Sequence, residues 1–403
     1  MHQRPFPTAK RLQLACCHLA ALLCFNRITV RRRHLSAVTG PVLYLGLHRN
    51  GALDGLPYLQ ATPHAAFLLS AQLHRSRLGR LLFPGIAVAR RQDRSRGIRA
   101  DNDQALEHCI QHLCDGGELF VLPEGTSSLG PRHLPFKSGA AHIAHRVLTE
   151  KVSLTVVPLA IHYERAWAWQ SRVEVVVGQP LVLQPQDNNA PAALRRRFSG
   201  MLEDVGINLD SEEELTRVEM LASAATLGSG LAYTDCLKHF EAGIADSLRR
   251  ETNILLAEAK NAGVLTHQGV PLMPLAASWR SCLTWLVLAP FVILFFATNP
   301  VPLLAGHLAG RLLADDRNVI AFWRAMIGVA TATLWVPMAL ALLGMMVGPW
   351  ALAAYAAITL IGLRLVFPFR RLSVAAYNTL RAPGFRAEFL SFHRSVLRDV
   401  THG

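Results

Sequence analysis

The chain has 403 residues, of which 51% are hydrophobic and 17% are charged, and its mean hydropathy is +0.25. That composition is too apolar for an ordinary cytosolic protein, so it predicts segments that enter a membrane. The formal net charge of +13 favours an anionic partner. Because no aromatic-basic patch or zinc-binding pattern accompanies the charge, we expect lipid headgroups or a phosphorylated substrate and no nucleic acid.

The first segment, residues 1–34, contains an apolar stretch from Leu12 to Phe25. The stretch is too short to cross a bilayer and includes the polar side chains of Gln13 and His18. A secretory signal is the alternative, but no small-residue cleavage site follows the stretch. We therefore predict an amphipathic helix that lies on the membrane surface.

Residues 35–185 are predicted to form an α/β domain, with a sheet surrounded by crossover helices. Short β-rich runs alternate with helical stretches along this part of the chain. The predicted strands cover residues 42–45, 86–88, 119–122, 154–157 and 173–177, and the predicted helices cover residues 102–115 and 138–149.

The rest of the chain is predicted to be helical. Residues 186–280 form a polar helical region, in which Ser211 and Glu214 fit a capping box. Residues 281–372 form a membrane region of two or three helices, because the runs from 281 to 304, 325 to 347 and 350 to 363 are almost free of charge. Helices buried in a large soluble core are the alternative. A tail follows over residues 373–403.

A histidine and an aspartate stand together directly after the first predicted strand, at His48 and Asp54. Histidine can act as a general base near neutral pH, and a carboxylate on its far nitrogen fixes the tautomer and stabilises the imidazolium. The two residues can meet if His48 ends the strand and Asp54 opens the next helix, with Gly51 in the turn between them. An ordinary loop histidine is the alternative.

Positive charge is predicted beside two later strands. The strand at residues 86–88 is followed by Arg90 and Arg91, whose planar guanidinium groups suit a phosphate; a solvated basic strand end is the alternative. The strand at residues 119–122 is followed by Pro-Glu-Gly-Thr, where a tight turn at residues 124–126 could hold an anion with its backbone N–H groups. Lys137 adds charge close to the start of the next predicted helix.

Taken in order, these segments, together with Val-Pro-Leu-Ala at residues 157–160, resemble the glycerophospholipid acyltransferase family over roughly residues 35–185. The resemblance implies that His48 deprotonates an acceptor hydroxyl, that Asp54 orients His48, and that Arg90 holds the acceptor phosphate. It also implies that three residues form the acceptor-site turn, namely Glu124, Gly125 and Thr126. The apolar C-terminal part is similar to that of a bacterial subgroup related to yeast glycerol-3-phosphate acyltransferases.

Two departures from the family pattern affect these expectations. Five residues separate His48 from Asp54, where the family usually has four. Ser127 stands where the family often has arginine after Glu-Gly-Thr, so Arg132 or Lys137 is expected to supply that charge.

The predicted reaction is transfer of a fatty acyl group from acyl-CoA or acyl carrier protein to a hydroxyl of glycerol 3-phosphate or lysophosphatidate. The alternatives are another lysolipid acceptor, or a membrane protein that binds lipid without catalysis. No metal or cofactor is expected, since the thioester is already activated, and a serine hydrolase is disfavoured because the chain has no Gly-x-Ser-x-Gly motif. The expected location is a membrane of the bacterial inner type, with the catalytic domain on the cytoplasmic side.

Overall fold

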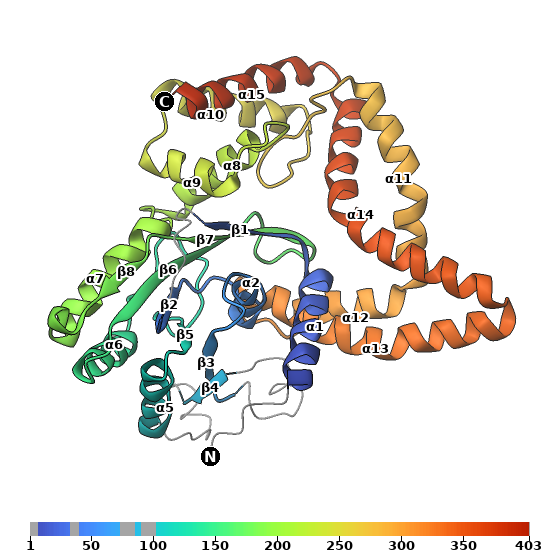
Figure 1. The fold of residues 1–403 in the computed structure, drawn as a ribbon. Coiled ribbons are helices and arrows are strands. Elements are labelled where there is room, and N and C mark those ends of the chain that lie inside the picture. The colour runs from blue at the N-terminus through green and yellow to red at the C-terminus, as the bar shows by residue number, and fades with distance from the viewer. Residues whose placement is uncertain (1–6, 33–39, 73–84, 90–101, 403) are drawn as a thin grey trace. The chain divides into compact units, whose positions relative to one another are not determined.

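The computed structural model describes residues 7–32, 40–72, 85–89 and 102–402 (Figure 1). Internal contacts divide the chain into two units, which we describe separately. The α/β unit comprises Met1–Leu22, Ile28–Tyr163 and Val173–Asn208. The helical unit comprises Leu23–Arg27, Glu164–Arg172 and Leu209–Gly403.

The α/β unit is organised by a mixed sheet whose strands follow the order β1-β7-β6-β2-β5-β3-β4, with β8 paired to β6. The strands are β1 (Phe25–Arg32), β2 (Val42–Gly46), β3 (Ala66–Ser70), β4 (Gly85–Val88), β5 (Glu118–Val121), β6 (Leu154–Tyr163), β7 (Ser171–Val177) and β8 (Leu181–Leu183). All five predicted strands are present, whereas β1, β3 and β8 were not predicted.

The central strands of this sheet are parallel. β2 pairs in parallel with both β5 and β6, and β3 pairs in parallel with β4 and β5. All five residues of β2 are buried, as expected for a strand whose two faces are both covered. The carboxyl ends of β2, β5 and β6 therefore meet at one edge, where loops of open α/β sheets usually carry the functional groups.

Helices cover the sheet as the alternating pattern predicted. They are η1 (Gly51–Asp54), α2 (Gly55–Ala61), α5 (Asn102–Cys114), α6 (Gly139–Thr149), η3 (Pro185–Asp187) and α7 (Pro191–Val205). Leu43 and Leu45 of β2 share one buried cluster with Val147 of α6 and Phe198 of α7. The expected α/β fold is thus confirmed. Ahead of it, α1 (Pro7–Cys24) is helical as predicted, while its placement on a membrane surface stays a prediction.

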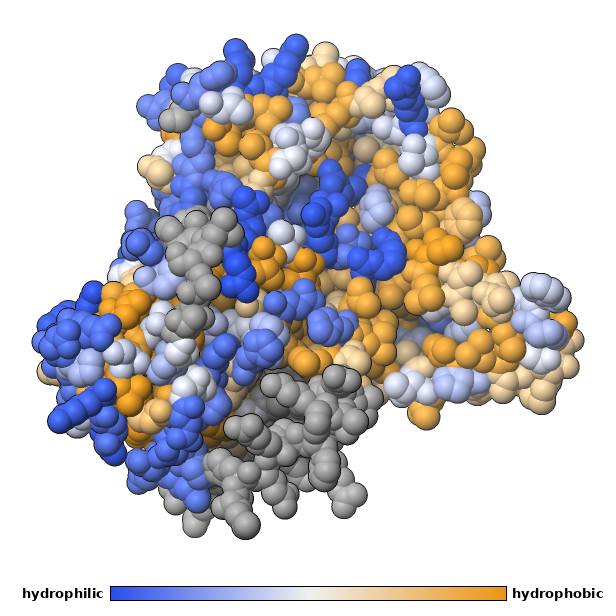
Figure 2. Space-filling view, viewed as in Figure 1, coloured by the Kyte–Doolittle hydropathy of each residue, from blue (hydrophilic) through white to orange (hydrophobic). Residues whose placement is uncertain are grey.

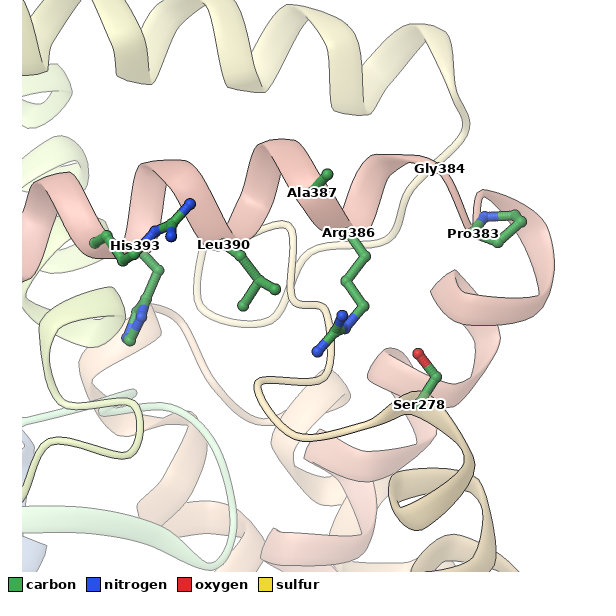
Figure 3. Close-up of a pocket in the computed structure, with 8 residues that line it drawn as sticks. Ser278, Pro383, Gly384, Arg386, Ala387, Leu390 and His393 are labelled. Carbon is green, nitrogen blue, oxygen red and sulfur yellow. The ribbon is translucent and has the colours of Figure 1, made fainter.

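The helical unit begins with polar helices. These are α8 (Glu212–Ala225), α9 (Tyr233–Ala242), α10 (Asp246–Asn261) and the final helix α15 (Phe385–His402). Ser211 caps α8 as predicted, because its side chain accepts a hydrogen bond of 3.1 Å from the backbone N–H of Glu214. Figure 3 shows a pocket beside α15, into which Arg386 points. The guanidinium of Arg386 donates to the backbone carbonyls of residues 274, 275 and 276, so it holds that loop in place.

Apolar helices make up the rest of the helical unit. They are α11 (Ser278–Thr298), α12 (Pro300–Leu312), η4 (Arg317–Val319), α13 (Ile320–Met346) and α14 (Pro349–Arg381). Three stretches within the described residues are long and apolar enough to cross a membrane, namely 278–298, 317–346 and 349–381. Many of their large side chains are exposed, among them Leu334 and Leu360. Figure 2 shows the resulting hydrophobic surface over these helices, which suits contact with lipid tails.

The first apolar run is interrupted where a continuous run was predicted. α11 ends at Thr298, and α12 starts at Pro300, a residue that lacks a backbone N–H and favours the first turn of a helix. Asn299 lies buried at the junction, where its amide donates to Phe295 O and to Thr359 Oγ1 and accepts a 2.8 Å bond from Tyr355 Oη. These hydrogen bonds satisfy the polar groups of Asn299 inside an apolar bundle. Beyond this break, α12 forms a separate helix that packs on α13.

Candidate active site

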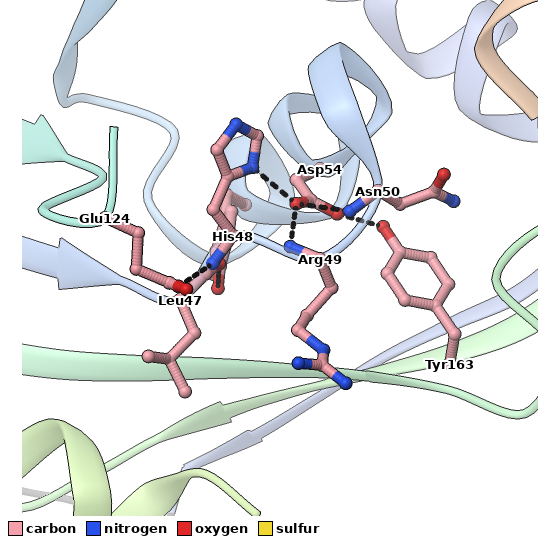
Figure 4. Close-up of polar contacts among 8 residues, drawn as sticks. Leu47, His48, Arg49, Asn50, Asp54, Glu124 and Tyr163 are labelled. Carbon is pink, nitrogen blue, oxygen red and sulfur yellow. Dashed lines mark hydrogen bonds and ion pairs between the residues drawn. The ribbon is translucent and has the colours of Figure 1, made fainter. Parts of the chain in front are cut away.

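His48 and Asp54 meet at the carboxyl end of β2. His48 follows the strand, Gly51 adopts a left-handed φ of +51°, and η1 then brings Asp54 back towards the histidine. The distance from His48 Nδ1 to Asp54 Oδ2 is 2.9 Å (Figure 4). The left-handed glycine and the short 3-10 turn accommodate all five intervening residues, so the longer spacing still permits the contact.

The Asp54 carboxylate is fully buried and held by four donors. Oδ2 accepts the backbone N–H groups of Arg49 at 2.7 Å and Asn50 at 2.9 Å in addition to His48 Nδ1. Oδ1 accepts a 2.5 Å bond from Tyr163 Oη. Because both oxygens are fixed in this way, the carboxylate can hold the imidazole ring in one orientation.

This arrangement determines which nitrogen of His48 is available for chemistry. With Nδ1–H donated to Asp54, the neutral ring carries its lone pair on Nε2. Figure 4 shows Nε2 pointing away from Asp54. His48 as a whole is only 9% exposed, so the imidazole is largely shielded from water. The ring can therefore accept a proton at Nε2 while Asp54 stabilises the resulting positive charge.

Two buried tyrosines support the site, and the sequence alone did not reveal either role. Burial is the main cause that raises the pKa of Tyr163 well above its usual value, and the nearby Asp54 charge adds to it, so the phenol stays protonated as a donor. Tyr58 Oη donates to Leu47 O at 2.7 Å and fixes the backbone just before His48. The role of Tyr163 could not be seen in the sequence, because it depends on the parallel pairing of β6 with β2.

Glu124, in the turn after β5, binds the backbone of the loop that contains His48. Its Oε1 accepts the N–H of His48 at 2.7 Å, and its Oε2 accepts the N–H of Leu134 at 3.0 Å. The N–H of Ser128 donates to His48 O at 3.0 Å. Burial, which outweighs these hydrogen bonds, raises the pKa of Glu124. The predicted contact of Glu124 with an acceptor stays a prediction.

The turn at residues 124–126 brings a positive charge to this edge. Gly125 has a left-handed φ of +71°, and a Cβ placed there would clash with Lys137 Nζ. The backbone N–H of Lys137 donates to Pro123 O at 2.9 Å, which folds the later loop over the turn. Thr126 and Lys137 are both exposed, so they remain accessible to a ligand.

The predicted phosphate-binding pair Arg90 and Arg91 lies outside the described residues. Just before the pair, β4 ends at Val88, and the side chain of Asn102 forms hydrogen bonds of 2.8 and 2.9 Å with the backbone of Ala89. Across the part of the chain that the structure describes, no three His, Cys, Asp or Glu side chains gather as metal ligands.

Comparisons with known proteins identify a family similarity in the first half of the chain. Residues 27–162 match the sequence model of the family described as Acyltransferase. Glycerol-3-phosphate O-acyltransferase 2 of Saccharomyces cerevisiae is 30% identical over 87 residues, which cover 21% of this chain and 12% of that protein. The chain thus spans about an eighth of that relative's length.

A solved structure, the 1-acyl-sn-glycerophosphate (LPA) acyltransferase PlsC from Thermotoga maritima, aligns with 49% of this chain and 76% of its own. Its sequence identity is 16% and its TM-score is 0.34. The family match covers His48, Asp54, Glu124 and the Val-Pro-Leu-Ala segment, and it confirms the resemblance inferred from the motifs. Over residues 27–162, the chain therefore carries a domain of the acyltransferase family.

Proposed function

We propose that this protein transfers an acyl group from a thioester donor to a hydroxyl of glycerol 3-phosphate or lysophosphatidate. The observation that carries the proposal is the buried contact of 2.9 Å between His48 Nδ1 and Asp54 Oδ2. Because four donors occupy the carboxylate oxygens, Nε2 of His48 is the basic atom of the pair that is free to accept a proton. Such a pair suits removal of a proton from an alcohol.

The proposed reaction proceeds in two proton transfers. His48 Nε2 takes the proton of the acceptor hydroxyl while the oxygen forms a bond to the thioester carbonyl carbon. The tetrahedral intermediate then collapses, the carbon–sulfur bond breaks, and the leaving thiolate takes a proton from the imidazolium. Asp54 stabilises the imidazolium between the two steps. The products are the acyl ester and the free thiol of CoA or of acyl carrier protein, and no cofactor takes part.

The acceptor phosphate is proposed to bind near the turn at residues 124–126. Lys137 supports this proposal because its ammonium group lies over Gly125 and is exposed. Arg90 and Arg91 are proposed as further phosphate contacts on the basis of the family resemblance. Arginine and lysine bind phosphate through charge-assisted hydrogen bonds, which favours a phosphorylated acceptor over a neutral one.

A membrane location suits both the donor and the product. The three apolar helices would hold the protein where acyl chains are stored. Arg317 lies in η4 and Arg324 lies near the start of α13, while Arg370 and Arg371 lie in the second half of α14. A hairpin of two spanning helices puts these positions on the same side, and the positive-inside rule makes that side cytoplasmic. We therefore propose a membrane of the bacterial inner type, with catalysis on its cytoplasmic face.

The test is acyl transfer in isolated membranes, with labelled glycerol 3-phosphate or lysophosphatidate and with oleoyl-CoA or oleoyl acyl carrier protein. The variant His48→Ala removes the proposed base, and His142→Ala is the matched control because His142 is exposed on α6. Product from one acceptor that disappears only in His48→Ala would support the function and identify the substrate. Product that persists in His48→Ala, or no product from any pairing with folded and inserted protein, would refute it.

A further inference from the structure

Six arginines gather within the helical unit, far apart in sequence but close in space. Arg165 and Arg172 lie in the connection between β6 and β7. The others are Arg317 of η4, Arg324 of α13, and Arg370 and Arg371 of α14. Electrostatic interactions link Arg370 to Arg165 and Arg324, and Arg371 to Arg172. We call these six residues the arginine cluster.

Three arginines of the arginine cluster contact Trp167. The guanidinium carbon of Arg317 lies 4.0 Å from the centroid of the indole ring, and that of Arg165 lies 5.4 Å from it. Nη1 of Arg324 donates to Trp167 O at 3.2 Å. A guanidinium that stacks on an aromatic face keeps its N–H groups at the edge, where they can bind an anion.

Two other arginines of the cluster contact the ring of Phe367. The guanidinium carbon of Arg172 lies 4.4 Å from the Phe367 ring centroid, and that of Arg370 lies 5.8 Å from it. The ring of His267 meets Phe367 edge-on at 6.2 Å. Two aromatic rings therefore hold arginines from separate segments at fixed places.

Among the described residues, few carboxylates offset the positive charge of the arginine cluster. In the described part of the chain, the one ion pair of these six arginines joins Arg172 Nη1 to Glu164 Oε1 at 3.8 Å. Glu164 also accepts a hydrogen bond from Gln268. Burial, together with the charges of Arg370, Arg371, Arg165 and Arg172, lowers the pKa of His267 to about 3, so this imidazole stays neutral.

Buried donor atoms also lack acceptors. The Nε atoms of Arg172, Arg324 and Arg370 are buried and have no hydrogen-bond partner among the described residues. A buried charged donor without an acceptor is costly, and native proteins usually satisfy such groups. Six guanidinium groups, one carboxylate and three buried N–H groups without acceptors together indicate a binding site for an anion.

We propose that the arginine cluster binds the phosphate group of an anionic membrane phospholipid. Arg317 and Arg324 lie at the start of one apolar stretch, and Arg370 and Arg371 follow the apolar part of α14, so the site lies where headgroups meet acyl chains. Planar guanidinium forks match phosphate oxygens. The exposed apolar surface of the neighbouring helices suits the tails (Figure 2). This lipid site is additional to the acceptor site proposed on the α/β unit and does not depend on acyl transfer.

The test is native mass spectrometry of the full chain released from nanodiscs of phosphatidylcholine with a minor fraction of phosphatidylglycerol. Wild type is expected to retain phosphatidylglycerol selectively. The double variant Arg370→Gln/Arg371→Gln is expected to retain at least about tenfold less, because each arginine contributes a several-fold effect on the binding of an anionic lipid. The matched control Arg250→Gln/Arg398→Gln removes the same charge from exposed positions of the helical unit and is expected to behave as wild type.

Equal retention of phosphatidylglycerol by wild type and the double variant would overturn the proposal. Displacement of the lipid by inorganic phosphate or glycerol 3-phosphate, with equal retention of phosphatidylcholine, would assign the site to a soluble phosphate and would also overturn it. If the glutamine variant does not fold, the retention of phosphatidylglycerol by Arg370→Lys/Arg371→Lys is measured in its place. It keeps the charge but loses the planar forks, so intermediate retention supports the site and wild-type retention refutes the role of the forks.

Discussion

Replacing Asp54 with asparagine would test the proposed mechanism most directly, since the structure predicts a change of charge with little change of shape. If the oxygen of the introduced amide takes the place of Oδ2, it still accepts the N–H groups of Arg49 and Asn50 and of the His48 ring. The amide NH₂ then faces Tyr163, whose hydroxyl can rotate to accept a hydrogen bond. The imidazole therefore keeps its position and its tautomer.

What Asp54→Asn removes is the negative charge that stabilises the imidazolium. At about 4 Å between charge centres and an effective dielectric constant near 20, that interaction is about 4 kcal/mol. Since 1.36 kcal/mol corresponds to about tenfold in rate, kcat is expected to fall by roughly a thousandfold. The Michaelis constants for donor and acceptor should change little, because neither substrate is proposed to contact Asp54.

The assay is steady-state acyl transfer by the purified protein in nanodiscs, with thermal unfolding of the same samples as the control for folding. Asp54→Ala provides the comparison, because it removes the hydrogen bonds as well as the charge and should lower both activity and unfolding temperature. Activity of Asp54→Asn within a factor of a few of wild type would refute the proposed role of the charge.

Three further changes address the surrounding groups. Tyr163→Phe removes the 2.5 Å hydrogen bond to Asp54 and should lower kcat by about tenfold or more, since bonds to charged groups contribute about 1.5–3 kcal/mol; an unchanged kcat would contradict this. Gly125→Ala should raise the Michaelis constant of the acceptor more than that of the donor, because the left-handed turn would be strained and a Cβ would displace Lys137. Glu124→Gln leaves one of two backbone N–H groups without an acceptor and should destabilise the fold by about 1–3 kcal/mol in chemical unfolding at neutral pH.

The pKa of Glu124 also predicts a pH dependence of stability. Because the folded state raises this pKa, native Glu124 binds its proton at a higher pH than the unfolded chain does. As the pH falls from 7 through the raised pKa, wild type should gain unfolding free energy relative to Glu124→Gln, and the gain should be complete below the unfolded pKa. Unfolding curves for both proteins across that range measure the difference, and a constant difference would contradict the assigned shift.

Much of the fold followed from local patterns in the sequence. The strand at residues 42–46 and the helices α5 and α6 were predictable because hydrophobic periodicity is a local property. The apolar C-terminal stretches were predictable because the thickness of a bilayer sets the length of apolar run that crosses it. The segment from His48 to Asp54 and the Pro-Glu-Gly-Thr turn were recognisable because each is a short continuous stretch of sequence.

Tertiary structure decided which of these groups meet, because that depends on the order and register of strands. Tyr163 reaches Asp54 since β6 pairs in parallel with β2, an adjacency that no local pattern encodes. Glu124 serves the backbone of His48 because β5 flanks β2 on the other side. In the arginine cluster, Arg172 and Arg370 are likewise brought together from distant segments, over the ring of Phe367. Sequence determined which residue types were available, and the packing of distant segments determined which of them act together.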